Sequence, residues 1–212
     1  FNDLDPLALE PDVRLRLVRQ PTELGTPDAV ILPGSKSTIA DLAFLRAQGW
    51  DVDIRAHHRR GGHLLGICGG YQLLGRTISD PDGIDGPAGT APGLGLLAID
   101  TVMTGDKSTV QVRGSHVGSG LPIEGYEIHI GRSDGPDCAR PLLDLHGRFD
   151  GAISADGRVQ GCYVHGLFSS DAFRRAFLAS FGIASSLAYE ARVDAALDAL
   201  ADHLEQHVDI ER

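Results

Sequence analysis

Apolar and polar residues alternate in blocks along this chain, and the blocks predict strands and helices in turn. Ala29 to Leu32 and His63 to Ile67 are short apolar runs, which is the pattern of strands buried on both faces of a parallel sheet. Each run ends at a turn containing glycine, and helical spacing of apolar residues follows over 39–45 and from Gly70 to Leu74. Because strand–helix–strand order produces right-handed crossovers, we predict an α/β fold with a mostly parallel central sheet flanked by helices.

Other segments carry the pattern of a sheet extension. Val13 to Val18 alternates with period two and predicts a strand, whereas Thr77 to Gly93 is rich in Gly, Pro and Asp and predicts a loop. Further short segments rich in β-formers and glycine predict antiparallel strands and hairpins. These segments are 94–103, 108–113, 125–130, 152–154 and 159–164.

The C-terminal part returns to helical spacing. Helices are predicted over 171–181 and 187–207. The second of these carries apolar residues on one face, namely Val193, Leu197, Leu200 and Leu204. This stripe indicates core packing or a docking face.

Cys68 stands at the most informative turn of the chain. It lies in Gly-Ile-Cys-Gly-Gly over 66–70, between a predicted strand and a predicted helix. Glycines permit positive φ and a close approach of substrate to the backbone, and the N-terminus of the following helix favours a thiolate. The arrangement is the cysteine counterpart of the nucleophile elbow of serine hydrolases, so we interpret Cys68 as a nucleophile.

A free cysteine is more often an inert core residue, and this alternative applies to the other two cysteines. Cys138 lies in a loop-like segment and Cys162 in a strand-like run, and neither has glycines on both sides of a strand-to-helix turn.

His165 is the preferred base for this nucleophile. It follows a predicted strand and precedes Gly166, which places it at the carboxyl edge of the sheet, where open α/β folds collect their active sites. The histidines of predicted helices, His57, His58, His203 and His207, stand among charged neighbours and are expected at the surface.

An oxyanion formed at the thiolate needs hydrogen-bond donors. The N–H of Gly69 directly follows the nucleophile, and the N–H of Gly34, at the end of the neighbouring strand, is a second candidate. The turn at Gly34 is equally well explained as a simple strand-to-helix connection.

Composition limits the classes of function. The 212 residues suffice for one α/β domain, with 42% apolar and 23% charged residues. A net charge of −10 argues against a nucleic-acid surface, and three cysteines without a disulfide framework favour the cytoplasm. The sequence opens at Phe1 without a Met and runs early into a predicted strand, so we expect a piece of a longer polypeptide.

Several motifs in order resemble class I glutamine amidotransferase domains, and most closely those of the cobyric acid synthase branch. The motifs are the elbow over 66–72, the Leu-Pro-Gly-Ser-Lys-Ser-Thr turn over 32–38 and Tyr-Val-His-Gly-Leu-Phe over 163–168. The Asp-Leu-Asp-Pro-Leu opening over 3–7 and Gly-Tyr-Glu-Ile-His over 125–129 extend the resemblance over nearly the whole chain.

The resemblance implies a glutaminase domain with a flavodoxin-like fold over 1–212. Cys68 would attack the side-chain amide of glutamine and form a thioester, and His165 would transfer protons in both halves of the reaction. Gln72 matches a position that helps to hold glutamine, and we place Glu127 and His129 with it at the substrate site. No metal site is expected in this domain.

The ammonia would pass to an ATP- and Mg-dependent synthetase domain that precedes this one in the same polypeptide and is absent here. In that branch the ammonia amidates carboxylates of adenosylcobyrinic acid a,c-diamide in cobalamin biosynthesis. No Gly-x-x-x-x-Gly-Lys-Ser/Thr phosphate loop occurs in the chain, as expected for the glutaminase half.

One position departs from the common pattern of class I amidotransferases. Many of them place a glutamate two residues after the histidine, where this chain has Leu167. The corrin branch is similar in lacking it, so we predict a Cys–His dyad, with Glu127 as a less favoured orienting group.

Three alternatives remain open at this point. The amidotransferase subunit of a ligase that amidates peptidoglycan lipid precursors shares the elbow and the missing glutamate. A non-catalytic scaffold of the same fold would not need Cys68 and His165, and a cysteine peptidase would cleave peptides instead of glutamine. Cyrinic acid a,c-diamide synthases fit less well at Tyr71 and Gln72.

Overall fold

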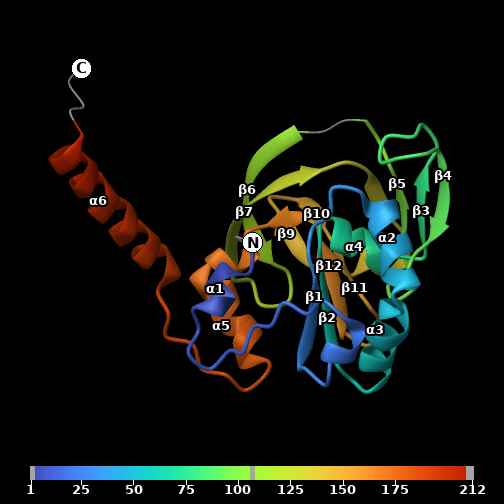
Figure 1. Cartoon of the computed structure of the whole chain (residues 1–212), viewed down its shortest axis with the longest axis horizontal. Helices are drawn as coiled ribbons and strands as arrows, with labels where there is room; N and C mark the ends of the chain where they lie inside the picture. The colour runs from blue at the N-terminus through green and yellow to red at the C-terminus, as the bar shows by residue number, and fades with distance from the viewer. Residues whose placement is uncertain (1–2, 106–107, 209–212) are drawn as a thin grey trace.

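The computed structural model describes residues 3–105 and 108–208, and its central sheet has the strand order β1-β2-β12-β11 (Figure 1). Strands β1 (Ala29–Leu32), β2 (His63–Ile67) and β12 (Val159–Cys162) run parallel, and β11 (Ala152–Ile153) is antiparallel to β12. The predicted α/β fold with a mostly parallel central sheet and an antiparallel extension is confirmed.

Successive residues of β2 enter two different cores, because side chains alternate across a strand. Leu64 belongs to a buried cluster with Leu42 and Ile54, while Leu65 belongs to a second cluster with Phe168. The central sheet is therefore covered on both faces, which explains its continuous apolar sequence.

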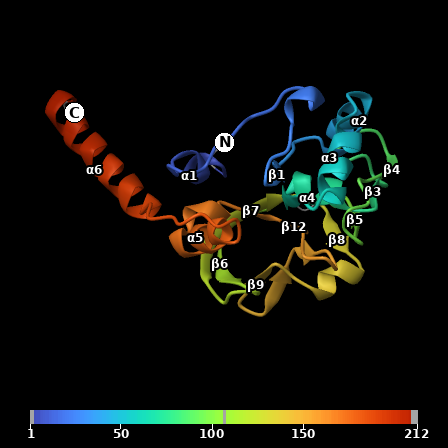
Figure 2. The same ribbon diagram turned by 90° about the horizontal axis from the view of Figure 1, so that it is seen from below.

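Helices α2 (Thr38–Ala47), α3 (Trp50–Arg59) and α4 (Gly69–Leu74) lie together on one side of the molecule (Figures 1 and 2). The expectation that His57 is a surface residue is wrong. Its side chain is 2% exposed, and its Nε2 lies 3.0 Å from the carbonyl oxygen of His63. His57 packs against Gly62, where a Cβ would lie 2.1 Å from its Cε1, so the ring fills the space left by this glycine.

The predicted loop over 77–93 contains a hairpin instead. β3 (Thr77–Asp80) and β4 (Gly89–Pro92) pair antiparallel, and β3 also pairs parallel with β5 (Asp100–Val102). Ile78 is fully buried and anchors the hairpin, which the many polar and glycine residues around it concealed in the sequence. Asp85, between the two strands, accepts hydrogen bonds from the N–H groups of Thr38 and Ile39 and caps α2.

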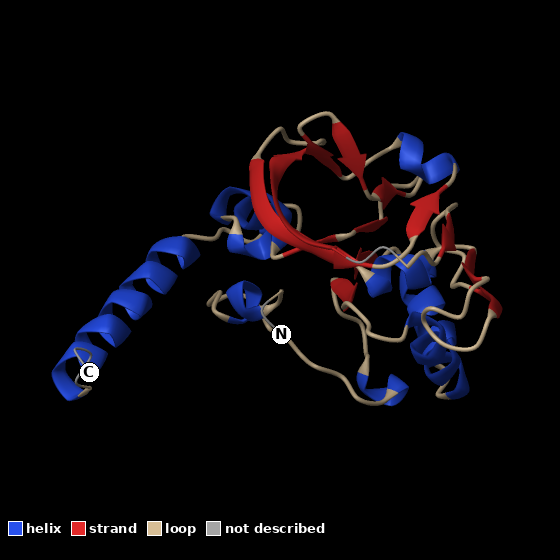
Figure 3. Cartoon of the chain, turned by 90° about the horizontal axis from the view of Figure 1, so that it is seen from above, coloured by secondary structure: helices blue, strands red, loops and turns tan. Residues whose placement is uncertain are grey.

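A second sheet has the order β10-β9-β6-β7-β13, and a third has the order β4-β3-β5-β8. Strands β6 and β7 are long and curved, and they wrap around one side of the molecule (Figures 1 and 3). The remaining strands are β6 (Ser108–His116), β7 (Pro122–His129), β8 (Arg132–Asp134), β9 (Leu143–Leu145), β10 (Arg148–Asp150) and β13 (Val164–His165).

The strand predicted over Val13–Val18 is not formed. This segment pairs with no strand of the described residues, and it lines a groove together with residues of β1. Val13 and Leu15 pack instead against the core cluster that includes Phe173. The helix α1 (Asp5–Ala8) precedes this segment, and the single-turn helix η1 (Pro21–Glu23) follows it.

The C-terminal helices are α5 (Asp171–Ala179) and α6 (Tyr189–His207), as predicted within a few residues. Single-turn helices η2 (Pro136–Ala139) and η3 (Leu167–Ser169) complete the secondary structure. Helix α6 projects away from the rest of the molecule in all three views (Figures 1 to 3). Within the described ranges, no helix is both long and apolar enough to cross a membrane.

Candidate active site

Cys68 occupies a strained turn between β2 and α4. Its backbone has φ 53° and ψ −112°, a left-handed conformation that a cysteine rarely adopts. The flanking glycines allow the turn because a Cβ on Gly70 would lie 2.0 Å from the carbonyl oxygen of Leu32. A Cβ on Gly66 would likewise lie 2.6 Å from the backbone nitrogen of Tyr71. The geometry is that of a nucleophile elbow, as the sequence predicts.

His165 lies beside this cysteine at the end of β13. The ring is 9% exposed and stacks on Tyr126 with a centroid distance of 5.1 Å. A Cβ on Gly34 would lie 2.9 Å from Cε1 of His165 and 3.7 Å from Cβ of Cys68. The structure therefore brings together the predicted nucleophile, the predicted base and the turn after β1.

Asp3 completes this group and was not assigned a role from the sequence. Its Oδ2 lies 2.8 Å from Nδ1 of His165, and its Oδ1 accepts a 2.7 Å hydrogen bond from the N–H of Gly166. The predicted dyad without an orienting carboxylate is thus corrected to a Cys–His–Asp arrangement. Asp3 stands 162 residues before His165, so no local spacing connects the two, and the family-like opening over 3–7 was the available signal.

The surroundings of His165 favour its charged, imidazolium form. Burial alone lowers the pKa of His165, but hydrogen bonds to Asp3 and Cys68, together with the charges of both, raise it to about 9. Burial would raise the pKa of Asp3, yet the hydrogen bonds from His165 and Gly166 outweigh it and lower this pKa. Asp3 therefore remains a carboxylate and His165 holds a proton at neutral pH.

The two predicted oxyanion donors flank the nucleophile. Gly69 is the first residue of α4, so its N–H has no acceptor within the helix. The turn after β1 lies directly against the start of α4, because a Cβ on Gly69 would lie only 2.7 Å from the backbone nitrogen of Ser35. Both glycines therefore lie next to Cys68, where their N–H groups are suitably placed for the predicted role of oxyanion donors.

Gln72 is 2% exposed, and its side-chain amide is hydrogen-bonded to other residues of the protein. Its Oε1 accepts a hydrogen bond from Thr38, and its Nε2 donates to the carbonyl of Ile130 at 2.9 Å and to the hydroxyl of Tyr163 at 3.3 Å. The side chain ties α4 to α2 and to the segment after β7. Direct contact of this amide with substrate stays a prediction.

Glu127 and His129 lie on β7 near the site. Both oxygens of Glu127 accept hydrogen bonds from Arg148, so the orienting role considered for Glu127 is filled by Asp3 instead. His129 stacks on Tyr163 with a centroid distance of 3.8 Å, and burial lowers its pKa. A substrate contact by either residue stays a prediction.

Comparison with known families gives a match over residues 1–173. The matched family is described as a CobB/CobQ-like glutamine amidotransferase domain.

Individual relatives carry the name "Cobyric acid synthase". The protein of Rhodobacter capsulatus is 64% identical over 188 residues, which cover 88% of this chain and 39% of the relative. The protein of Ruegeria sp. is 59% identical over 212 residues, covering the whole chain and 44% of the relative. The chain thus spans about two fifths of the length of these relatives and corresponds to their C-terminal part.

Solved structures show the same fold at low identity. One titled "Crystal structure of glutamine amidotransferase" matches with a TM-score of 0.62 and 22% identity, over 85% of this chain and 91% of that one. A second, titled "Structure of PurLQS from Thermotoga maritima", has a TM-score of 0.62 and 19% identity, over 85% and 92%.

Proposed function

Because the chain belongs to the CobB/CobQ-like glutamine amidotransferase domain family, we propose that it hydrolyses glutamine at Cys68 and supplies the ammonia to an amidating ligase. The observation that carries the proposal is that Asp3 contacts His165 and that His165 in turn interacts with Cys68 at the strained turn between β2 and α4.

The first half-reaction forms a thioester. The thiolate of Cys68 attacks the side-chain carbonyl carbon of glutamine, and the N–H groups of Gly34 and Gly69 stabilise the oxyanion. The imidazolium of His165 then protonates the amide nitrogen, so that the C–N bond breaks and ammonia leaves.

The second half-reaction restores the enzyme. His165, now neutral, accepts a proton from water, and the hydroxide oxygen attacks the thioester carbon. The C–S bond breaks, glutamate leaves, and the proton held by His165 restores the starting pair. Asp3 accepts a hydrogen bond from Nδ1–H of His165 throughout, remains ionised, and fixes which ring nitrogen faces the sulfur.

The relatives support one use of the ammonia. Their name supports ATP-dependent amidation of adenosylcobyrinic acid a,c-diamide to cobyric acid over a ligase of peptidoglycan lipid precursors. ATP and Mg²⁺ would be bound by the synthetase part that precedes this domain in the longer polypeptide. We place the protein in the reducing cytoplasm, which suits its free cysteines Cys68, Cys138 and Cys162.

The deciding measurement is ammonia release from glutamine. The 212-residue chain and the full-length polypeptide are compared with their Cys68→Ala and His165→Ala variants, and Cys138→Ala serves as the matched control. We expect both site variants to abolish release, the control to retain it, and the synthetase part to increase it. No release from either folded protein would overturn the proposal, and cleavage of peptides but not glutamine would replace it with a peptidase.

A further inference from the structure

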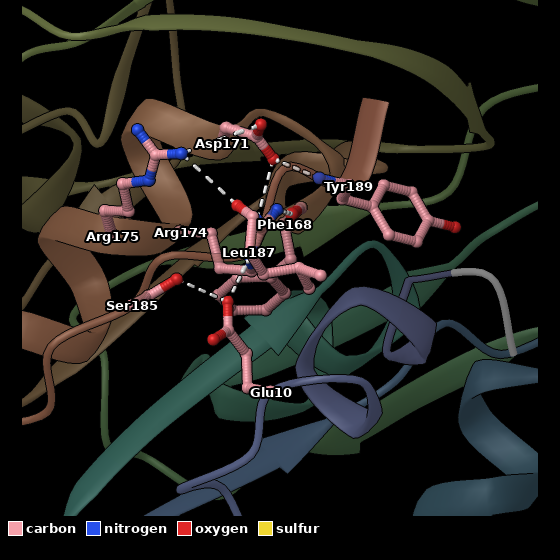
Figure 4. A network of polar contacts seen from close by, with 8 residues as sticks. All are labelled: Glu10, Phe168, Asp171, Arg174, Arg175, Ser185, Leu187 and Tyr189. Carbon is pink, nitrogen blue, oxygen red and sulfur yellow. Dashed lines mark hydrogen bonds and ion pairs between the residues drawn. The ribbon is translucent and has the colours of Figure 1, made fainter. Parts of the chain in front are cut away.

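Helix α6 is fixed at its base by a buried polar network (Figure 4). Arg174 of α5 is fully buried and donates to Glu10, to Asp171 and to the carbonyl oxygen of Leu187. Asp171 also accepts a hydrogen bond from the N–H of Tyr189, the first residue of α6. The start of α6 is therefore held in place on α5.

Beyond its first turn α6 presents an apolar surface to solvent. The α6 stripe consists of Val193, Leu197, Leu200 and Leu204, which are 37%, 58%, 52% and 43% exposed. The 4-3-4 spacing places all four side chains on one face of the helix. No residue of α6 is buried, so the described residues of this domain leave uncovered the face predicted from the sequence as core packing or docking.

The position of the α6 stripe points to the missing part of the longer protein as its cover. In the relatives the other three fifths of the polypeptide precede the matched part, so they join it through the segment of Asp3 and α1. Helix α1 lies next to the base of α6, and Leu9 and Val193 line a cleft between the two helices. A domain joined at α1 would therefore lie within reach of α6.

Charge argues against a second copy of this chain as the cover. An acidic row, Glu190, Asp194, Asp198 and Asp202, runs beside the α6 stripe at four-residue spacing. An antiparallel pair of α6 helices would bring the acidic rows of both copies together, and like charges destabilise helix pairing. The stripe also covers fewer than the roughly three heptads that a stable coiled coil needs.

We propose that the α6 stripe docks into an apolar groove, rimmed by basic residues, on the synthetase part of the full-length polypeptide. This rests on the proposed function, because it assumes that a synthetase part is present. The acidic row then meets the basic rim, which orients the two domains in addition to the covalent connection through α1.

The test is site-specific photo-cross-linking in the full-length polypeptide. A p-benzoylphenylalanine replaces Leu200 in one variant and Ala195, on the opposite face of α6, in the matched control. We expect Leu200→p-benzoylphenylalanine to give cross-links within one polypeptide to peptides of the synthetase part, several-fold above the Ala195 control. Hydrogen exchange of amides 193–204 should be slower in the full-length protein than in the 212-residue chain.

A double variant, Leu197→Asp with Leu200→Asp, should remove this protection, since each buried leucine lost weakens docking by about thirtyfold. Cross-links between two polypeptides would overturn the proposal in favour of a second copy. Equal cross-linking from both positions would overturn it in favour of a free helix. The Cys68→Ala variant should cross-link like the wild type, so failure of docking and failure of glutamine hydrolysis are separable.

Discussion

Asp3 determines which nitrogen of His165 carries a proton. An ionised carboxylate can only accept a hydrogen bond, so Nδ1 of His165 must be the donor. In the proposed mechanism, Nε2 is then the nitrogen that exchanges a proton with the thiol and with the leaving ammonia. The same contact contributes to the rise of the His165 pKa to about 9. The imidazolium required for ammonia release is thus present at neutral pH and is lost as the pH rises through this value.

Removing the carboxylate of Asp3 should change both the pKa and the tautomer of His165. Asp3→Asn removes the negative charge, so the pKa of His165 falls and the alkaline limb of the pH profile moves from about 9 to lower pH. The wrong tautomer is also populated, so kcat/KM should fall by about a hundredfold or more. The measurement is the pH dependence of glutamine hydrolysis.

The matched control is Asp12→Asn, the same change at an exposed carboxylate of the same N-terminal segment. Its profile should overlay that of the wild type. If Asp3→Asn left the alkaline limb in place, Asp3 would hold the fold together without orienting the base.

Gly34 leaves room for the catalytic ring. In Gly34→Ala the new methyl group would lie 2.9 Å from Cε1 of His165, so the ring must move from its present position beside Cys68. We expect kcat/KM to fall by about tenfold or more, because misplaced reacting groups lose near-attack geometry. Gly89→Ala is the control, since its Cβ meets no atom within 4 Å. A normal rate in Gly34→Ala would show that the ring of His165 can move to accommodate the methyl group without loss of its function.

The proposed nucleophile and base could be singled out from the sequence because each carries local backbone signals. Cys68 has glycines at a strand-to-helix turn, and His165 ends a strand before a glycine. Asp3 could not be found from pattern, since its role depends on a contact over 162 residues. The surroundings of Gln72 and Glu127 were equally hidden, because Thr38, Ile130 and Arg148 meet them only in the fold.

At the scale of elements, the Arg174–Glu10 ion pair connects the N-terminal segment to α5. Both side chains are at most 1% exposed, and Ser185 adds a second donor to Glu10 Oε1. Oε2 of Glu10 is buried and has no hydrogen-bond partner among the residues that the structure describes. Such a pair is costly to break, since either partner alone becomes an uncompensated buried charge.

We therefore expect Arg174→Leu to reduce the free energy of unfolding by about 3–5 kcal/mol, measured by urea denaturation. The double variant Arg174→Leu with Glu10→Leu should recover much of this loss, because no buried charge is left. Glutamine hydrolysis should weaken in the single variant as Asp3, in the same segment as Glu10, loses its fixed position. If Arg174→Leu alone were as stable as the wild type, the Arg174–Glu10 ion pair would contribute little to the free energy of unfolding.

Periodicity predicted the elements whose apolar faces are buried, such as β1, β2, α2 and α5. It failed where tertiary contacts decide. The β3–β4 hairpin forms around Ile78, a buried apolar residue within a polar segment. In contrast, Val13–Val18 alternates like a strand but pairs with no strand of the described residues. Alternation predicts an extended backbone, and only the surrounding fold determines whether it joins a sheet.

At the scale of the whole molecule, α6 differs from every other long helix in having no buried residue. Its packing therefore contributes little to the stability of this domain. Ending the chain after Arg192 keeps Tyr189, whose N–H bonds to Asp171, and removes the α6 stripe.

We expect the chain that ends at Arg192 to melt within about 2 °C of the intact 212-residue chain, because residues 193–208, the part of the lost segment that the structure describes, are all exposed. Its rate of glutamine hydrolysis should be unchanged, since the site lies among β1, β2, β13 and the segment of Asp3. In the full-length polypeptide the same truncation should uncouple the two activities, so that more ammonia escapes for each amide formed. A large drop in melting temperature of the isolated domain would show that α6 folds back onto it in solution.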